Sequence, residues 1–231
     1  MEECMLQDHP LFGKKALFVG DSIALALRDI PDEQGLQGWA KYAAKEYGMI
    51  CTNAAVGGAA LNSKTRLRRF GNQGVIANQI KKHEGEAFDC VLIHGGLNDA
   101  WDGVPLGKIT NSFDSADFDP TTYAGGLETA FYQAVKCFGK GVALGYLINF
   151  NSPNHSATSG AGEYYEWGKK VCAKWGIEYL DLFHQPFDTA KYTQDTLHPN
   201  AEGYVVLGRY VCDFLPNIRP IPPEIAEKIV V

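Results

Sequence analysis

The sequence predicts an α/β protein: a three-layer α/β/α sandwich around a parallel sheet of about five strands. Short, continuous apolar runs alternate along the whole chain with longer stretches whose apolar residues recur at helical spacing. Strands that are apolar on both faces are typical of a parallel sheet with helices on both sides. Right-handed helical crossovers between neighbouring strands then produce the three layers.

The predicted strands and helices alternate in order along the chain. We expect strands at residues 16–19, 49–56, 88–94, 141–150 and 177–182. We expect helices at residues 38–47, 74–83, 123–138, 162–175 and 201–215. The third of these helices has the clearest period, with an apolar stripe formed by Leu127, Phe131, Ala134 and Phe138.

One long segment, residues 101–120, does not fit this alternation. It is polar, rich in Gly, Asp and Ser, and without periodicity. A loop of this length in a compact domain is often a lid or a binding loop. An insertion without a catalytic role explains it equally well.

Length and composition indicate a single domain spanning residues 1–231. Of the 231 residues, 45% are hydrophobic and 21% charged, which is ordinary for a globular protein and excludes general disorder. The net charge of −6 disfavours nucleic acid and anionic membranes as partners. A basic cluster at Arg66, Arg68 and Arg69 is a local exception, and a solvated surface is its simpler interpretation. Many proteins of this size form homo-oligomers, and the sequence leaves the oligomeric state open.

The cysteines and the first residues predict a cytoplasmic protein. Cysteines stand at positions 4, 51, 90, 137, 172 and 212 without a CxxC pair, a scatter typical of reduced thiols. Cys51 and Cys90 fall within predicted buried strands, where cysteine packs as a small apolar residue. The first residues lack the apolar core of a signal peptide, and no later run could span a bilayer. A secreted protein without its signal would look similar, and only then would the sequon at Asn154 matter.

Four short stretches hold every group that an acyl-transfer site needs. They are Gly20-Asp21-Ser22-Ile23, residues 53–58, Gly96-Leu97-Asn98-Asp99 and Asp195-Thr196-Leu197-His198-Pro199. Ser22, Gly58 and Asn98 each follow a predicted strand, so their loops should converge at the carboxyl edge of the sheet, where such sheets bind ligands. Each stretch alone is weak evidence, but together they predict a hydrolytic enzyme.

Ser22 is the candidate nucleophile, and it needs a base because a serine hydroxyl attacks poorly at neutral pH. On a tight turn or a first helical turn, the three-residue spacing of Asp195 and His198 places the carboxylate against Nδ1 of the imidazole. Nε2 is then left for Ser22. Pro199 suits the first turn of the last helix. Helix capping by Asp21 or Asp195 would explain each stretch on its own.

Gly58 and Asn98 are the candidate donors for an oxyanion, since a glycine allows close approach of the backbone and asparagine offers a side-chain amide. Because Gly57 precedes Gly58, the residues alone leave open which N–H donates. A tight turn would also explain the glycines, and a helix cap would explain Asn98. We expect Asp21 and Asp99 to cap or support these groups rather than to catalyse.

In order, the four stretches resemble the sequence blocks of the SGNH (GDSL-type) hydrolase superfamily. They span positions 20 to 199, and the GxND pattern of the third block matches Gly96, Asn98 and Asp99. Ile23 stands where the GDSL name has leucine, a conservative difference. The resemblance implies a flavodoxin-like sheet and a serine esterase with a Ser-His-Asp triad.

The resemblance also implies a role for each matching residue. Ser22 corresponds to the nucleophile, and Asp195 and His198 to the acid and base of the triad. The oxyanion hole corresponds to the Ser22 N–H, the Gly58 N–H and the Asn98 amide. Gly58, rather than Gly57, is the glycine that matches the second block.

The expected substrate is a short acyl ester, of acetyl type, of a carbohydrate or another small alcohol. Trp101, Tyr146 and Phe150 would supply aromatic contacts near the site, which suits a sugar, with Trp101 as the candidate substrate-binding residue. No extended apolar lid is evident, which disfavours a long-chain lipase. An O-acyltransferase with the same triad and a non-catalytic carbohydrate-binding protein on this fold are the alternatives.

No cofactor and no metal are expected. His94 ends a predicted strand and is interpreted as a structural neighbour of the site. His9, His83, His155 and His184 have no partner at metal-ligand spacing, and no HExxH or Cys–His group occurs. No phosphate loop or dinucleotide fingerprint occurs either.

Overall fold

The computed structural model describes residues 7–65, 71–153 and 160–229. The basic cluster at Arg66, Arg68 and Arg69, together with the sequon at Asn154 and the neighbouring His155, lies outside these ranges. Within the described ranges, every helix is too short or too polar to cross a membrane.

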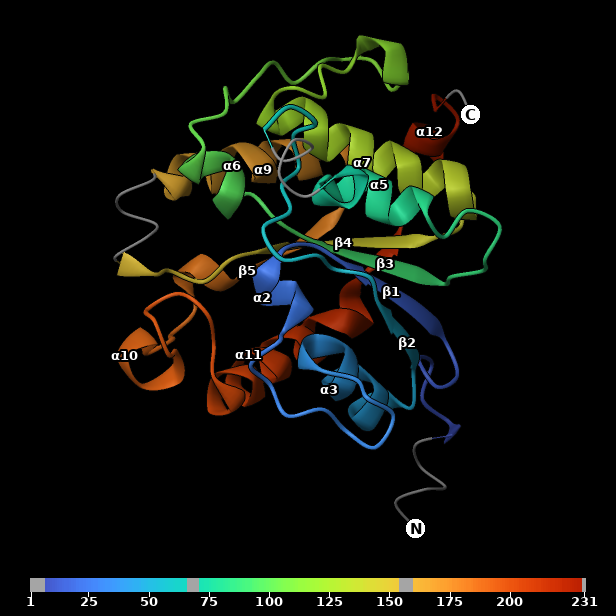
Figure 1. The fold of residues 1–231 in the computed structure, drawn as a ribbon. Coiled ribbons are helices and arrows are strands. Elements are labelled where there is room, and N and C mark those ends of the chain that lie inside the picture. Colours follow the sequence, from blue (N-terminus) through green and yellow to red (C-terminus); the bar gives the residue numbers. More distant parts are fainter. Residues whose placement is uncertain (1–6, 66–70, 154–159, 230–231) are drawn as a thin grey trace.

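The predicted three-layer α/β/α sandwich is present (Figure 1). Its five parallel strands are β1 (Lys15–Val19), β2 (Ile50–Asn53), β3 (Cys90–His94), β4 (Ala143–Ile148) and β5 (Glu178–Asp181). They lie in the order β2-β1-β3-β4-β5, the flavodoxin-like order. A two-residue strand that was not predicted, β6 (Arg219–Pro220), pairs antiparallel with the start of β4.

Long helices cover both faces of the sheet. On one face lie α3 (Gly38–Tyr47) and α11 (Ala201–Phe214); on the other lie α5 (Ile76–Lys81), α7 (Tyr123–Phe138) and α9 (Ala161–Trp175) (Figure 1). The short helix α2 (Ser22–Leu25) agrees with the interpretation of Asp21 as a helix cap. The sequence did not predict the other short elements, which are α6 (Leu97–Trp101), α10 (Thr189–Tyr192), α12 (Pro223–Ala226), η1 (Asn72–Gly74), η2 (Ser115–Asp117), η3 (Leu182–His184) and η4 (Leu215–Asn217). Helices of about one turn are too short to show a period.

Local sequence sets the ends of the long helices. Asn200 caps α11, because its side-chain oxygen accepts the N–H of Gly203 at 2.9 Å. Pro199 therefore lies before the helix, and its prediction as a first-turn residue is wrong. α3 ends at Gly48, whose left-handed φ of 64° is accessible to glycine without steric cost.

Central and edge strands differ in burial. Cys90 and the rest of β3 are buried, as predicted for a strand covered on both faces. In β2, at the edge of the sheet, Ile50 is 56% exposed and Cys51 is half-buried. The prediction that Cys51 lies in a buried strand is wrong, because an edge strand lacks a neighbour on one side. The five described cysteines are free thiols.

The long loop after α6 packs against the helical layer. Phe113 and Phe118 are buried and contact the ring of Trp175, with centroids 5.1 and 6.0 Å apart. Lys174, next to that ring, forms an ion pair with the buried Glu128 of α7. These contacts hold this part of the loop on the outer side of α7 and α9 (Figure 1), which favours a structural insertion over a lid.

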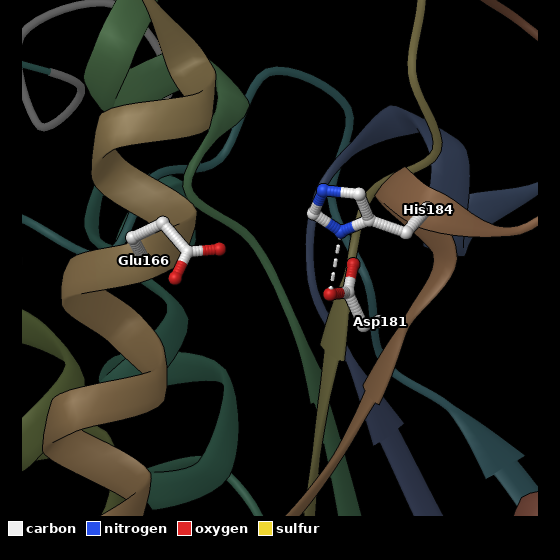
Figure 2. Close-up of side chains that lie close together, drawn as sticks. All are labelled: Glu166, Asp181 and His184. Atoms are coloured by element: carbon white, nitrogen blue, oxygen red, sulfur yellow. Dashed lines mark hydrogen bonds and ion pairs between the residues drawn. The ribbon is translucent and has the colours of Figure 1, made fainter.

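A cluster of charged side chains lies at the carboxyl end of β5 (Figure 2). Asp181 Oδ2 lies 2.8 Å from His184 Nδ1, and potential ligand atoms of Glu166, Asp181 and His184 lie within 4.8 Å of one another. The prediction that His184 has no such partners is therefore wrong, since Glu166 comes from α9 and spacing could not reveal it. Lys169 Nζ lies 2.5 Å from Glu166 Oε1 and 2.6 Å from Asp181 Oδ2, so an ammonium already neutralises these carboxylates.

Candidate active site

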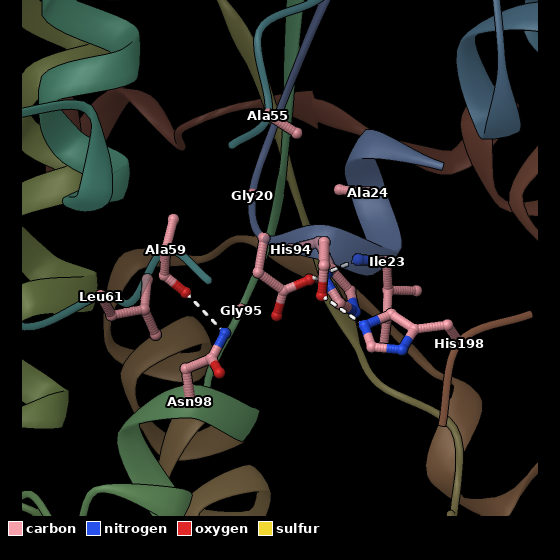
Figure 3. A network of polar contacts seen from close by, with 12 residues as sticks. Gly20, Ile23, Ala24, Ala55, Ala59, Leu61, His94, Gly95, Asn98 and His198 are labelled. Carbon is pink, nitrogen blue, oxygen red and sulfur yellow. Dashed lines mark hydrogen bonds and ion pairs between the residues drawn. The ribbon is translucent and has the colours of Figure 1, made fainter. Parts of the chain in front are cut away.

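The ends of neighbouring strands bring the predicted site residues together. Ser22 begins α2 directly after Gly20-Asp21 at the end of β1, and Asn98 lies in α6 after β3. Figure 3 shows Asn98 and His198 on either side of the strand end that carries Gly20. β1 and β3 are adjacent, at the position where the strand order reverses, which is the usual ligand site of such sheets.

Ser22, His198 and Asp195 form a continuous line of polar contacts. Ser22 Oγ lies 3.0 Å from His198 Nε2, and His198 Nδ1 lies 2.8 Å from Asp195 Oδ2. Asp195 Oδ1 accepts the backbone N–H groups of Leu197 (3.2 Å) and His198 (2.7 Å). Because the carboxylate holds Nδ1, the other imidazole nitrogen is directed at the serine hydroxyl.

The Asp195 carboxyl is stabilised as an anion. Burial raises its pKa, but the hydrogen bonds from His198 and Leu197 lower it by more, so that the pKa lies well below its ordinary value. A fixed negative charge next to the ring stabilises the imidazolium that forms when a serine is deprotonated. Arg28 Nη1 also lies 2.9 Å from Asp195 Oδ2. Sequence reasoning missed this contact, because no motif links positions 28 and 195.

The backbone of the 195–198 turn is held in an unusual conformation. Thr196 has a φ of 65°, which is rare for a β-branched residue. The hydroxyl of the buried Ser152, after β4, donates to the Thr196 carbonyl at 2.5 Å. Thr193 and Pro199 form an antiparallel bridge that closes the loop. Such a conformation persists only where its surroundings fix it, so the imidazole is held in place before any substrate binds.

The segment that carries Ser22 is fixed by side chains from other elements. Gln79 of α5 accepts the N–H of Gly20 at 2.8 Å and donates to its carbonyl at 2.9 Å. Asp21 caps α2 by accepting the N–H of Ile23 at 2.9 Å, as predicted, and Tyr204 of α11 donates to the Ile23 carbonyl at 2.8 Å. Helices from both faces of the sheet therefore hold the serine in position.

A second Asp–His pair lies behind the serine. His94 Nδ1 is 3.2 Å from Asp21 Oδ1, and both side chains are buried. Burial raises the pKa of Asp21, but the charge of His94 and the hydrogen bonds lower it by more. A Cβ at Gly20 would lie 2.6 Å from the His94 carbonyl oxygen, so only glycine allows this approach. Sequence reasoning identified His94 as a structural neighbour but not as the partner of Asp21.

The structure places the segments of the two predicted oxyanion donors, Gly58 and Asn98, next to each other. A Cβ built on Gly57 would lie 4.0 Å from the Cβ of Ser22, so the Gly57–Gly58 turn is beside the serine. Gly58 has a left-handed φ of 78°. Asn98 Nδ2 donates to the carbonyl of Ala59 at 2.9 Å, which orients the amide (Figure 3).

A model of the GDSL-like lipase/acylhydrolase family matches residues 18–206, which include all four sequence stretches. The chain belongs to this family. The resemblance to SGNH hydrolases is thereby confirmed. A comparison with curated proteins found no match.

Solved structures of other proteins share the fold over almost the whole chain. A Lactobacillus plantarum protein is 22% identical over 90% of this chain and 99% of its own, with a TM-score of 0.66. A member of the lipolytic G-D-S-L family from Veillonella parvula is 18% identical over 88% and 99%, with a TM-score of 0.60. A catalytic mutant of an acetylxylan esterase from Geobacillus stearothermophilus is 18% identical over 87% and 94%, with a TM-score of 0.57.

In this GDSL-like hydrolase, Asp99 connects the two segments that carry the oxyanion candidates. The buried carboxylate accepts the backbone N–H groups of Leu61 (3.0 Å) and Asn62 (2.9 Å) and the side-chain amide of Asn62 (2.8 Å). Burial raises the pKa of Asp99 despite these bonds. Asp99 is thus a supporting residue, in agreement with the sequence-based interpretation.

The predicted aromatic contacts are only partly accessible. Trp101, one turn after Asn98 in α6, is 55% exposed. Tyr146 and Phe150 are completely buried, and the Tyr146 hydroxyl donates to the carbonyl of Gly95 at 2.8 Å. Their prediction as aromatics for a bound sugar is wrong, because they belong to the interior strand β4 and its continuation.

Proposed function

We propose that this chain is a serine ester hydrolase that acts through an acyl-enzyme. The observation that carries the proposal is the line of contacts from Ser22 Oγ through His198 to Asp195, at 3.0 and 2.8 Å. Ser22 attacks the ester carbonyl while His198 Nε2 takes the hydroxyl proton. His198 then returns this proton to the leaving alcohol. Water attacks the acyl-enzyme with His198 again as the base, which releases the acid and restores Ser22.

The negative charge on the carbonyl oxygen is stabilised by the backbone N–H groups of Ser22 and Gly58 and by Nδ2 of Asn98. This assignment is supported by the Gly57–Gly58 turn beside Ser22 and by the Ala59 carbonyl that orients the amide. Donors fixed before the reaction stabilise the transition state without reorganising.

The proposed substrate is a short acyl ester, of acetyl type, of a carbohydrate or another small alcohol. The exposed Trp101 lies one turn from Asn98, where its ring can stack on a sugar next to the reacting carbonyl. One of the similar structures is that of an acetylxylan esterase, which supports this class of substrate.

The first test compares wild type with Ser22→Ala. We expect wild type to hydrolyse p-nitrophenyl acetate and to be labelled by a fluorophosphonate at Ser22, whereas the variant does neither. Circular dichroism controls for folding. Equal turnover by the two proteins, or labelling elsewhere, would contradict the assignment of the nucleophile.

The substrate class is tested separately with acetyl to long-chain esters and an acetylated xylo-oligosaccharide. We expect acetyl esters to be preferred, and Trp101→Ala to raise KM for the acetylated sugar more than for a small aliphatic acetate. Preference for long acyl chains, or an equal effect of the variant on both acetates, would contradict the proposed substrate.

A further inference from the structure

We propose that Arg28 is a positioning residue of this site, which holds Asp195 and extends activity to lower pH by opposing the imidazolium form of His198. The inference rests on the proposed roles of Ser22, His198 and Asp195. It concerns a contact that neither the sequence motifs nor the family assignment includes.

Arg28 and His198 share one carboxylate oxygen. Arg28 Nη1 lies 2.9 Å and His198 Nδ1 lies 2.8 Å from Asp195 Oδ2. The other oxygen, Oδ1, accepts two backbone N–H groups of the turn. The Arg28 guanidinium therefore partly neutralises the Asp195 carboxylate charge, which would otherwise stabilise the imidazolium form of His198.

Arg28 is held between two fixed points of the segment that carries the nucleophile. Ala26 ends α2 in the left-handed conformation, with φ of 58°. Asp29 is buried, accepts the N–H of Gly38 at 2.8 Å and pairs with Lys41 at 2.6 Å. The Arg28–Asp195 contact thus joins the nucleophile segment to the acid–base turn.

The charges around His198 determine in which direction Arg28 shifts the pH range of activity. Asp195 on its own turn and the buried Asp21 at the start of α2 favour the imidazolium, while His94 from β3 pairs with Asp21. Arg28 is a cation on the Asp195 carboxylate and opposes them. Since the base must be neutral to accept the serine proton, a cation on the shared carboxylate keeps His198 competent at lower pH.

The contact should also be sensitive to salt. The side chains of Arg28 and Asp195 are 36% and 40% exposed, so ions in solution screen their interaction. High salt should therefore shift the pH dependence of activity in the same direction as removal of the guanidinium charge.

The chain offers a matched control. Lys169 Nζ lies 2.6 Å from Asp181 Oδ2, which in turn lies 2.8 Å from His184 Nδ1. Lys169→Met therefore removes a cation from a similar Asp–His turn that does not contact Ser22.

The experiment measures kcat/KM for p-nitrophenyl acetate, and the rate of fluorophosphonate labelling of Ser22, across the acid limb of the pH profile. We expect Arg28→Met to move this limb to higher pH by about 0.5 pH unit. This corresponds to a roughly threefold loss of kcat/KM below the midpoint, with little change on the plateau. Arg28→Lys, which keeps the charge, and Lys169→Met should match wild type. High salt should move the wild-type limb toward that of Arg28→Met.

Two results would overturn the inference: coincident limbs for Arg28→Met and wild type, or an equal loss at every pH without a shift of the limb. The second result would reduce Arg28 to a structural contact. Failure of the proposed function would give a different result. Wild type would then not be labelled at Ser22, and Ser22→Ala would turn over the ester as fast as wild type. Circular dichroism verifies that all variants are folded.

Discussion

Two Asp-x-x-His stretches of this molecule share the same contact between a carboxylate and an imidazole. One runs from Asp181, the last residue of β5, to His184, and the other runs from Asp195 to His198 before α11. In each, the aspartate Oδ2 lies 2.8 Å from Nδ1 of the histidine three residues later. The Asp–His contact alone therefore does not distinguish the two turns chemically.

Their electrostatics are similar as well. Lys169 lies 2.6 Å from Asp181 Oδ2, and Arg28 lies 2.9 Å from Asp195 Oδ2. For both carboxyls burial raises the pKa, and hydrogen bonds lower it by more; the charges of Lys169 and His184 add to this for Asp181, and the charge of His198 adds to it for Asp195. Both aspartates are consequently anions at neutral pH.

The turns differ in what the second imidazole nitrogen faces. His198 Nε2 lies 3.0 Å from Ser22 Oγ, whereas the His184 side chain is 63% exposed and packs edge-on against Phe183. An oriented imidazole becomes useful for acyl transfer only when the fold places a hydroxyl opposite it. The contrast shows that the motif provides the orientation and the tertiary structure provides the reaction partner.

Replacing the histidine of each turn should give the largest difference in activity between the two turns. His198→Ala should lower kcat by on the order of 10⁴–10⁶, because Ser22 loses its base. His184→Ala should change kcat by less than about twofold, a typical result for a surface substitution away from the site. Steady-state turnover of p-nitrophenyl acetate measures both, and similar losses in the two variants would remove the functional distinction.

Replacing the two aspartates should give a smaller contrast. Asp195→Asn should lower kcat by on the order of 10³–10⁴, since a neutral amide favours the wrong tautomer of His198 and stabilises its imidazolium less. Asp181→Asn should leave kcat within about twofold. The same assay with both variants checks this, and full activity of Asp195→Asn would contradict the role of the carboxylate.

Asn98, the proposed oxyanion donor, extends the comparison, because it should contribute to the reaction at the 195–198 turn and not at the 181–184 turn. Asn98→Ala should lower kcat by on the order of 10²–10³ with little change in KM, since the amide stabilises charge that appears in the transition state. Steady-state kinetics with an acetyl ester, with thermal unfolding as the control, test this. A change confined to KM would indicate that Asn98 binds the ground state instead.

The smallest expected effect concerns stability at the 181–184 turn. Asp181→Asn should lower the free energy of unfolding by no more than about 1 kcal/mol at pH 7, because the ion pair is partly exposed. The pKa of Asp181 is lowered in the folded protein, so its contribution is present above the ordinary carboxyl pKa and is lost as pH falls through the folded value. Urea unfolding of both proteins at neutral and acidic pH should show the difference shrinking in acid, and a constant difference would exclude this origin.

Local sequence was sufficient for the layers of the fold and for the chemical groups of the candidate site. Strand runs and helical periods are short-range signals, so the α/β/α sandwich followed from them without any long-range information. The four sequence stretches named Ser22, Gly58, Asn98, Asp195 and His198, and the family match covers all of them.

Packing between distant segments decided the rest. The local signals did not show that Arg28 shares the carboxylate of Asp195, that His94 pairs with Asp21, or that Tyr146 is buried in the interior strand β4. These contacts depend on strand order, on the position of each strand within the sheet and on side chains that approach from different helices. Such pairings join residues far apart in the chain, and no short-range pattern encodes them.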